Sequence, residues 1–520
     1  MKRVPLQATG TASHDEVRVF PPEEVRGRLG ARSERLRTWW ALGGCLLLAL
    51  LLRVPHLSTP LGRDEGGLSY IAQHWPGGDG SLYGAYWVDR PPLLILLFKA
   101  AVLGGDSGVG VRVLGAVAAV ALVIGVTLLA RAVEGPRAGW IAGLLAALMS
   151  GSVSLGSIFT PGELLAVVPS TFSVLCLVLA HRSRDARFVF AAGALAVCAA
   201  LVKQSFLDAG FAGAVFVVAS AVADRDVRRR WPLAYAAGAA IPLAALLLWL
   251  AAAQESIGGF VYTLFGFRLQ LLNTLAGSDI PLDARFRKLE EPAWESGLTI
   301  VLGAALLGLY CLRKDRVLVV TWIAWLAAAT FGVLGGGSYF AHYLIGLVPV
   351  SCVAAAVVLA RVPLPVCIAV LGAVLWLALP TAREGAQYEA KHPLRRSEVG
   401  VARYVREHAR PGDTHYVMYA RPNVVYYAGL RHPYPYMWSL MVRAKPGALS
   451  ELQRLLGSEQ RPTWLVQWQD EARWELDPDG RTARLISDGY RLAATVCGKA
   501  IYLRDDRPRP PLSLGTCPKR

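Results

Sequence analysis

The sequence predicts an α-helical protein that crosses a membrane many times and ends in a small α/β domain. Hydrophobic residues make up 54% of its 520 residues, charged residues only 18%, and the mean hydropathy is +0.40. Soluble domains of ordinary composition are about one quarter charged. Uncharged runs such as 232–253 and 343–360 are long enough to cross a bilayer as a helix. These observations predict a polytopic membrane protein.

Eleven apolar segments are predicted to form the membrane-spanning helices. They are 38–55, 111–132, 138–157, 163–180, 188–203, 205–223, 232–253, 297–312, 317–335, 341–360 and 362–380. The preceding residues, 1–37, mix proline, glycine and charges of both signs without an apolar period, and are expected to be a disordered cytoplasmic tail. The predicted domains are therefore this tail, a transmembrane domain over 38–380 and a C-terminal domain over 381–520.

Basic residues between the apolar segments predict the orientation in the membrane. In an alternating count the basic loops all fall on the side of the N-terminal tail; they lie near 131–137, 182–187, 225–230, 313–316 and 361. The positive-inside bias makes that side cytoplasmic, and an odd number of spans places 381–520 outside. Although the net charge is +16, the arginines lie in short clusters between apolar runs, as is typical of cytoplasmic loops, so no nucleic-acid partner is expected.

The first extracytoplasmic loop, 56–110, is predicted to contain two helices that lie in the membrane interface. The segments LSYIAQHW (68–75) and PPLLILLFKAAVLGG (91–105) are apolar but too short to span the bilayer. The second begins with proline, which is favoured in the first turn of a helix. Four aromatic residues are expected at the level of the lipid headgroups: Trp75, Tyr83, Tyr86 and Trp87.

The C-terminal region has the mixed pattern of an α/β domain. Helical spacing covers 395–409 and 447–458, and strand-like alternation covers 414–420, 463–468 and 500–505. The tyrosine-rich run 416–438 is either a surface for stacking on sugars or an ordinary domain core. Cys497 and Cys517 are either a disulfide or two free thiols, and no cysteine pair has the spacing of metal ligands.

Ionisable residues gather at the predicted outer ends of the spans. The basic ones are Arg63, Arg90, Lys99, Arg112, Lys203 and His342, and the acidic ones are Asp64, Glu65, Asp89 and Glu163. Snorkelling to the interface explains Lys99 and Arg112, but not a set of opposite charges on one face. A carboxylate there can take a proton from an acceptor, and cations can stabilise a departing lipid phosphate. If a sugar is attached through that phosphate, one carboxylate and two or three cations are enough for glycosyl transfer by direct displacement, with inversion at the anomeric carbon.

The same residues carry a resemblance to a known family. GRDEGGLSYIAQHW (62–75) and the block that begins YWVDRPPLLILLFKA (86–100) resemble the first loop of the GT-C membrane glycosyltransferases. The nearest patterns are those of the protein O-mannosyltransferases and the lipid A aminoarabinose transferases. AALVKQS (199–205) and YFAHYLIGLVP (339–349) are similar to later segments of that family. The resemblance implies a sugar donor linked to polyprenyl phosphate and an extracytoplasmic protein, lipid or glycan acceptor.

The resemblance also implies a role for each matched position. Asp64 would be the catalytic base and Glu65 its neighbour at the acceptor. The substrate-binding set would be Arg90 and Lys203 at the donor phosphate, His342 and Tyr343 lining the donor site, and Asp89 and Glu163 beside them. Arg90 stands where the family usually has lysine, and Glu163 where it often has aspartate. No metal or other cofactor is expected, with a divalent ion as the alternative, and the sugar would be mannose or another hexose or pentose.

Two other functions compete with glycosyl transfer. A transporter or lipid flippase would carry ionisable groups near mid-membrane, and Asp208 is the deepest such residue here. A scaffold that displays the C-terminal domain would not need the charged first loop. Because the interiors of the spans are almost free of charge while one surface is rich in it, the sequence favours an enzyme of the interface.

Overall fold

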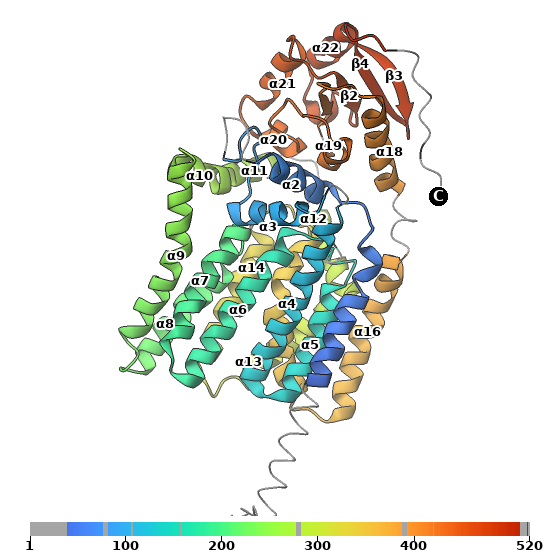
Figure 1. Ribbon diagram of the computed structural model, residues 1–520. Helices are drawn as coiled ribbons and strands as arrows, with labels where there is room; N and C mark the ends of the chain where they lie inside the picture. The colour runs from blue at the N-terminus through green and yellow to red at the C-terminus, as the bar shows by residue number, and fades with distance from the viewer. Residues whose placement is uncertain are drawn as a thin grey trace, which may run out of the picture.

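The computed structural model describes residues 39–75, 82–105, 108–156, 159–276, 282–386, 393–419, 421–509 and 517. Its helices between 39 and 386 form a bundle, and residues 393–509 form a separate mixed layer on one end of that bundle (Figure 1). Two short helices of the first loop lie between the two parts (Figure 1). The predicted tail 1–37 lies outside the described residues.

Among the described residues, six helices are long and apolar enough to cross a membrane. They are Trp39–His56, α4 (Val109–Glu134), α6 (Gly162–Ser183), α9 (Arg230–Ala252), α14 (Arg316–Leu334) and the segment Ala341–Leu359, which joins η3 (Ala341–Leu347) to α15 (Val348–Leu359). A pair bent by 82°, Asp283–Glu295 with Leu298–Cys311, raises the number to seven if it is one span.

The mostly helical fold is confirmed, but the count of eleven spans is not. Every predicted apolar segment is helical over most of its length, and the segments that are not of spanning length lie in α5 (Pro136–Ser150), α7 (Ala186–Val202), α8 (Asp208–Ala223), α13 (Leu298–Cys311) and the apolar part Leu364–Pro380 of α16 (Leu364–Ala386). The 17 residues of α7 rise about 25 Å. That length is less than the hydrocarbon core of about 30 Å, so hydropathy alone does not make these helices full spans.

Glycines allow neighbouring helices of the bundle to pack backbone against backbone. A Cβ on Gly193 of α7 would come within 2.2 Å of the Tyr235 carbonyl oxygen on α9. In return, a Cβ on Gly238 of α9 would come within 1.9 Å of the Phe190 carbonyl oxygen on α7. Small residues at such crossings are typical of helix association in lipid, where dispersion contacts replace the hydrophobic driving force.

The first loop contains the two predicted helices, α2 (Arg63–His74) and α3 (Pro92–Val102). A proline occupies the first turn of α3, as expected. The prediction that Tyr86 and Trp87 lie at headgroup level is wrong, because both are buried against the C-terminal domain. The Tyr86 hydroxyl donates to the His432 carbonyl at 3.1 Å, and the Trp87 amide donates to the Pro435 carbonyl at 3.1 Å.

The C-terminal domain is a four-stranded sheet with helices around it. The strands are β1 (His415–Val417), β2 (Trp464–Gln467), β3 (Tyr490–Val496) and β4 (Lys499–Arg504), in the order β1-β2-β4-β3. The pair β1/β2 is parallel and the other pairs are antiparallel. The helices are α18 (Pro393–His408), α19 (Pro422–Ala428), α20 (Ser439–Ala444), α21 (Ala448–Leu456) and α22 (Arg481–Gly489). Remaining elements are η1 (Val54–His56), α10 (Ile257–Val261), η2 (Tyr262–Gly266), α11 (Phe267–Ala276), α12 (Leu282–Glu295) and η4 (Arg473–Glu475).

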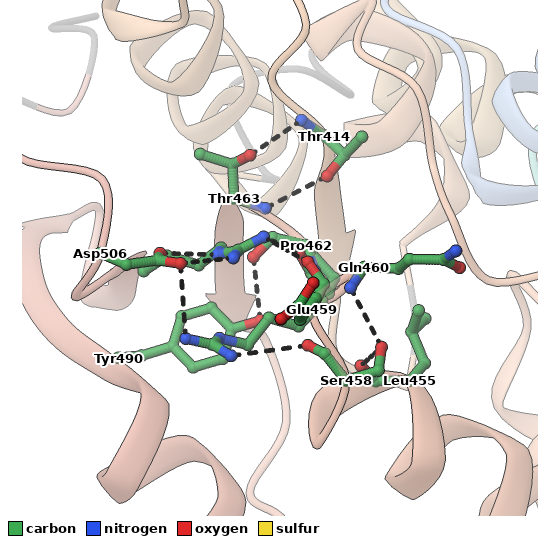
Figure 2. Close-up of polar contacts among 11 residues, drawn as sticks. Thr414, Leu455, Ser458, Glu459, Gln460, Pro462, Thr463, Tyr490 and Asp506 are labelled. Atoms are coloured by element: carbon green, nitrogen blue, oxygen red, sulfur yellow. Dashed lines mark hydrogen bonds and ion pairs between the residues drawn. The ribbon is translucent and has the colours of Figure 1, made fainter.

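Side-chain hydrogen bonds and a disulfide connect segments of the C-terminal domain around this sheet. Figure 2 shows Thr414 and Thr463 exchanging hydrogen bonds between amide and hydroxyl, at 3.3 and 3.2 Å, next to the β1/β2 pair. The Tyr490 hydroxyl donates to the Pro462 carbonyl at 2.9 Å (Figure 2). Cys497 and Cys517 form a disulfide, which settles the alternative that the sequence left open.

The C-terminal domain is seated directly on α2, and two glycines make this contact possible. A Cβ on Gly66 would lie 2.5 Å from the Asn423 Cα, and a Cβ on Gly67 would lie 2.4 Å from the Trp438 ring. The Tyr70 hydroxyl adds a hydrogen bond to the Leu430 carbonyl at 3.0 Å. The glycine pair that follows Asp64 and Glu65 in the sequence is therefore the surface on which the second domain rests.

We expect Gly67→Ala to loosen this contact. The added methyl group would overlap the Trp438 ring and the Pro422 Cβ, which lies 2.8 Å from the ideal Cβ position. Overpacking of this kind costs about 1–3 kcal/mol. The variant should melt at a lower temperature and expose α2 to proteolysis, whereas Gly303→Ala, where a Cβ meets nothing within 4 Å, should not. Equal melting of both variants would contradict the close seating.

Candidate active site

Asp64 lies in the first turn of α2, at the end of the bundle that faces the C-terminal domain. Its Oδ1 accepts a hydrogen bond from the Trp438 indole Nε1 at 2.9 Å. Solvent reaches the side chain, although protein surrounds it on most sides. A carboxylate that is held in place and still open to a second molecule suits a general base.

Charged neighbours keep Asp64 ionised. Burial alone would raise its pKa, but the Arg90 guanidinium, the Trp438 hydrogen bond and the charges of His342 and Arg63 together lower the pKa below the ordinary aspartate value. Arg90 responds in the opposite sense: burial opposes its charge, yet the carboxylates of Asp89 and Asp64 raise the pKa of its guanidinium. The two groups therefore stabilise each other's charged form across the site.

Glu65, the next residue on α2, points into the protein. Its Oε1 accepts from Arg112 Nη1 at 2.5 Å and from the Thr160 amide at 2.8 Å, and its Oε2 accepts from the Gly62 amide at 2.7 Å. The side chains of Glu65 and Arg112 are only 6% and 2% exposed. Both carboxylate oxygens are thus occupied by protein, so Glu65 ties the start of α2 to the bundle.

Asp89 joins two arginines at the entrance of α3. Its Oδ1 pairs with Arg90 Nη1 at 2.8 Å and its Oδ2 pairs with Arg268 Nε of α11 at 2.6 Å. The Asp89 backbone carbonyl accepts from Gln204 Nε2 at 2.8 Å, which brings in the segment after α7. Asp89 is buried, whereas both arginines retain partial exposure, so this carboxylate aligns two cations without hiding them.

A second cluster joins α6, the end of α7 and η3. Buried Glu163 pairs with Lys203 Nζ and lies 3.5 Å from His342 Nε2. Lys203 also lies over the Tyr343 ring, 4.9 Å from its centre. Glu163 therefore holds a lysine and a histidine side by side at the upper end of the bundle.

The two clusters lie close enough to interact. Lys203 interacts electrostatically with both Arg90 and Arg268, and His342 interacts electrostatically with Asp64. All eight predicted site residues are thereby brought to one end of the bundle. They comprise Asp64, with Glu65 beneath it, then Asp89 and Arg90, and finally Glu163, Lys203, His342 and Tyr343.

Sequence reasoning missed two residues of this site, Arg268 and Trp438, and interpreted a third, Arg112, wrongly. Arg268 carries a signal that could have revealed it, because a basic residue between 254 and 296 lies on the predicted outer side, against the positive-inside bias. Arg112 is not a snorkelling residue; it is buried and paired with Glu65. Trp438 gives no local signal, since it lies 374 positions from Asp64.

The described residues contain no group of three or more histidine, cysteine, aspartate or glutamate side chains that could hold a metal ion. Asp89 and Glu163 are the acidic residues nearest the cations. Both are engaged by arginine, lysine or histidine partners. A divalent ion at these two carboxylates would have to displace those partners.

Comparison with known proteins identifies the fold. Residues 89–249 match the family model described as dolichyl-phosphate-mannose-protein mannosyltransferase. ArnT from Cupriavidus metallidurans in the apo state is 16% identical, has a TM-score of 0.61, and is matched over 89% of this chain and 97% of its own. The chain has the GT-C fold. The resemblance to GT-C membrane glycosyltransferases is thereby confirmed.

Other solved GT-C structures share this fold. ArnT from Cupriavidus metallidurans bound to undecaprenyl phosphate has a TM-score of 0.58, at 16% identity and with 89% and 97% of the two chains covered. The apo oligosaccharyltransferase of Archaeoglobus fulgidus has a TM-score of 0.57, at 15% identity, over 90% of this chain and 74% of its own. No curated protein matches the chain in sequence. The likeness is therefore one of fold.

Proposed function

We propose that the chain is an integral membrane glycosyltransferase that moves a sugar from a polyprenyl-phosphate donor to an extracytoplasmic acceptor. One observation carries the proposal: a solvent-reachable carboxylate, Asp64, stands beside a set of partly exposed cations at one end of the bundle. The ArnT structure that contains undecaprenyl phosphate supports the class of donor. The expected absence of a metal remains a prediction.

In this proposal Asp64 is the catalytic base. The acceptor hydroxyl or amine attacks the anomeric carbon while its proton passes to the Asp64 carboxylate. The bond between the anomeric carbon and the phosphate oxygen breaks, and the electron pair leaves on the phosphate. A single displacement of this kind inverts the anomeric centre.

The cations opposite Asp64 would bind and stabilise the departing phosphate. Arg90 presents a planar guanidinium suited to two phosphate oxygens, and Arg268, aligned through Asp89, is added to the predicted set. Lys203 and His342 complete it, both held by Glu163. Because a phosphate monoester is a good leaving group, fixed positive charge replaces a general acid.

Glu65 takes a different role from the catalytic one that the resemblance implied. Its two oxygens are bound to Arg112, Thr160 and Gly62, so it has no oxygen turned toward an acceptor. We assign it a positioning role: it fixes the N-terminal turn of α2, and through that turn the neighbouring Asp64.

The side of the membrane is part of the proposal. The first loop and the C-terminal domain share one end of the bundle and are in direct contact, in keeping with their predicted common side. The disulfide Cys497–Cys517 supports an oxidising, extracytoplasmic location for that end. The N-terminus would then be cytoplasmic. The sugar, mannose or another hexose or pentose, and the protein, lipid or glycan acceptor stay open.

The competing transporter or flippase hypothesis would need Asp208 to bind cargo. Its Oδ2 accepts hydrogen bonds from Ser170 Oγ at 2.8 Å and from Trp325 Nε1 at 2.7 Å. These two bonds tie α8 to α6 and α14. We therefore interpret Asp208 as a structural residue of the bundle, and we favour the enzyme.

Mass spectrometry of glycoconjugates tests the proposed function. Cells with and without the protein should differ by one sugar on one class of envelope protein, lipid or glycan. Restoring the wild-type gene should restore that sugar. Identical glycan and glycolipid profiles in both strains would contradict the proposal.

Arg90→Ala should weaken use of the donor more than use of the acceptor. The variant removes a charge-assisted contact to the phosphate, so we expect the KM for the donor to rise by about ten- to hundredfold. Arg90→Lys keeps a charge but loses the planar guanidinium, so its KM for the donor should lie between those of the wild type and Arg90→Ala. Arg137→Ala is the control, because Arg137 follows the end of α4 that is far from Arg112 and Glu65. An equal rise in KM for donor and acceptor would contradict phosphate binding by Arg90.

A further inference from the structure

We infer that Trp438 is a positioning residue: the C-terminal domain uses its indole to hold the Asp64 carboxylate in the orientation for proton transfer. The active site would then be complete only when the C-terminal domain is seated on α2. This inference rests on the proposed function, because it takes Asp64 to be the base. It assigns the C-terminal domain a part in the reaction.

The hydrogen bond selects one oxygen of Asp64 for the protein and leaves the other for substrate. Trp438 Nε1 donates to Oδ1 at 2.9 Å. Among the described residues, none donates a hydrogen bond to Oδ2. An indole has a donor and no acceptor, so it binds a carboxylate but cannot take the substrate proton itself. Trp438 therefore fixes the rotation of the Asp64 side chain without competing for its chemistry.

The indole is held in place from both domains. Its ring lies across Gly67, one turn along from Asp64, where any side chain would displace it. Trp438 is also the N-cap of α20, so its backbone is fixed by the C-terminal domain. On the neighbouring helix α19, Asn423 Nδ2 donates to the Leu61 carbonyl at 3.2 Å, just before α2. The distance between α2 and Trp438 is thus set by several contacts besides the hydrogen bond.

Trp438 is a neutral donor among charged neighbours of Asp64. The charged or titratable groups around this carboxylate are Arg63 on α2, Arg90 before α3, and His342 and Tyr343 on η3. From the C-terminal domain, Arg421 and Glu398 pair with each other at 2.7 Å. Since Trp438 helps to lower the pKa of Asp64, its removal should raise that pKa and move the acidic limb of the pH profile to higher pH.

Kinetics of two matched variants test the inference. Trp438→Phe keeps the ring and removes the donor. Trp464→Phe removes the same kind of bond elsewhere in the domain, where Trp464 Nε1 donates to Asp413 Oδ2 at 3.1 Å. We expect Trp438→Phe to lower kcat by about tenfold, to leave the KM for the donor unchanged, and to shift the acidic limb upward. Trp464→Phe should lower the melting temperature without shifting that limb. An unshifted limb in a folded Trp438→Phe protein overturns the inference.

A spectroscopic measurement decides the contact without any assay of sugar transfer. The full chain, labelled with ¹⁵N-tryptophan and placed in lipid nanodiscs, gives one indole N–H signal per tryptophan, and Trp438→Phe identifies the relevant one. We expect this signal to move as the pH falls through the Asp64 pKa, and to stop titrating in Asp64→Asn. A signal that ignores both changes overturns the inference. If the wild type transfers no sugar while the signal titrates, the proposed function fails and the contact stands.

Discussion

Asp64→Asn should abolish sugar transfer and leave the protein folded. The substitution is isosteric, and the asparagine oxygen can still accept the Trp438 hydrogen bond, so the seating of the C-terminal domain on α2 should persist. What is lost is the ability to take a proton from the acceptor. Removal of a general base costs about 10²–10⁴ in rate, so transfer should fall to background.

The measurement is transfer of sugar from a polyprenyl-phosphate donor in membranes that contain equal amounts of each protein. Asp185→Asn is the matched control, because this residue caps α7 at the opposite end of the bundle and asparagine also caps helices. It should keep wild-type activity. Full activity of Asp64→Asn would refute the assignment of the base.

Glu65→Gln should destabilise the fold, although it changes the neighbour of the base by only one atom. Arg112 would keep its buried charge and lose the opposing one, and the Gly62 amide would face an NH₂ group or lose its acceptor. Breaking one partner of a buried ion pair costs about 3–5 kcal/mol. We therefore expect a large fall in melting temperature and in the yield of folded protein.

The double variant Glu65→Gln with Arg112→Leu separates this charge effect from packing. Removing both charges should recover part of the stability that the single variant loses, since no unpaired buried charge remains. The Thr59 and Pro60 carbonyls would lose the hydrogen bonds that Arg112 donates to them, so recovery should be incomplete. If Glu65→Gln melts like the wild type yet loses activity, Glu65 is catalytic and the positioning role is wrong.

The sequence predicts the position of Asp64 and Glu65 but not the direction in which each side chain points. The adjacent carboxylates, their position at the start of a helix and their place in the first loop are all evident from the pattern of residues. Which of the two stays open to solvent depends on Arg112 and Thr160, which reach α2 only after the bundle has formed. The Glu65 carboxylate is bound within the fold, and the Asp64 carboxylate remains for the proposed reaction.

Hydropathy predicts where the helices of the bundle lie better than it predicts which of them cross the membrane. Hydropathy identifies apolar segments, and each of the eleven is helical over most of its length. It does not report bends, and the 82° turn between Asp283–Glu295 and Leu298–Cys311 divides one region into two helices of different direction. Nor does it distinguish a full span from the 17-residue α7, whose length falls short of the bilayer.

Local sequence patterns do not predict contacts between residues that are far apart in the chain. Arg268 reaches Asp89 from α11, which lies between α9 and α14 in the chain, and Trp438 reaches Asp64 from the C-terminal domain. The tyrosine-rich run 416–438 was ambiguous between sugar stacking and a domain core. Most of its aromatic side chains, including Tyr416, Tyr419 and Tyr434, are buried, which favours the core, while its last residue faces the base.

The central claim is that Asp64 and the donor phosphate share one site. The most direct test is a cryo-electron microscopy structure of the full chain in lipid nanodiscs with undecaprenyl phosphate added. We predict phosphate density in contact with Arg90 and with Lys203 or Arg268, on the side that faces Asp64, and its loss in Arg90→Ala. Phosphate bound elsewhere, or bound equally well by Arg90→Ala, would contradict the account.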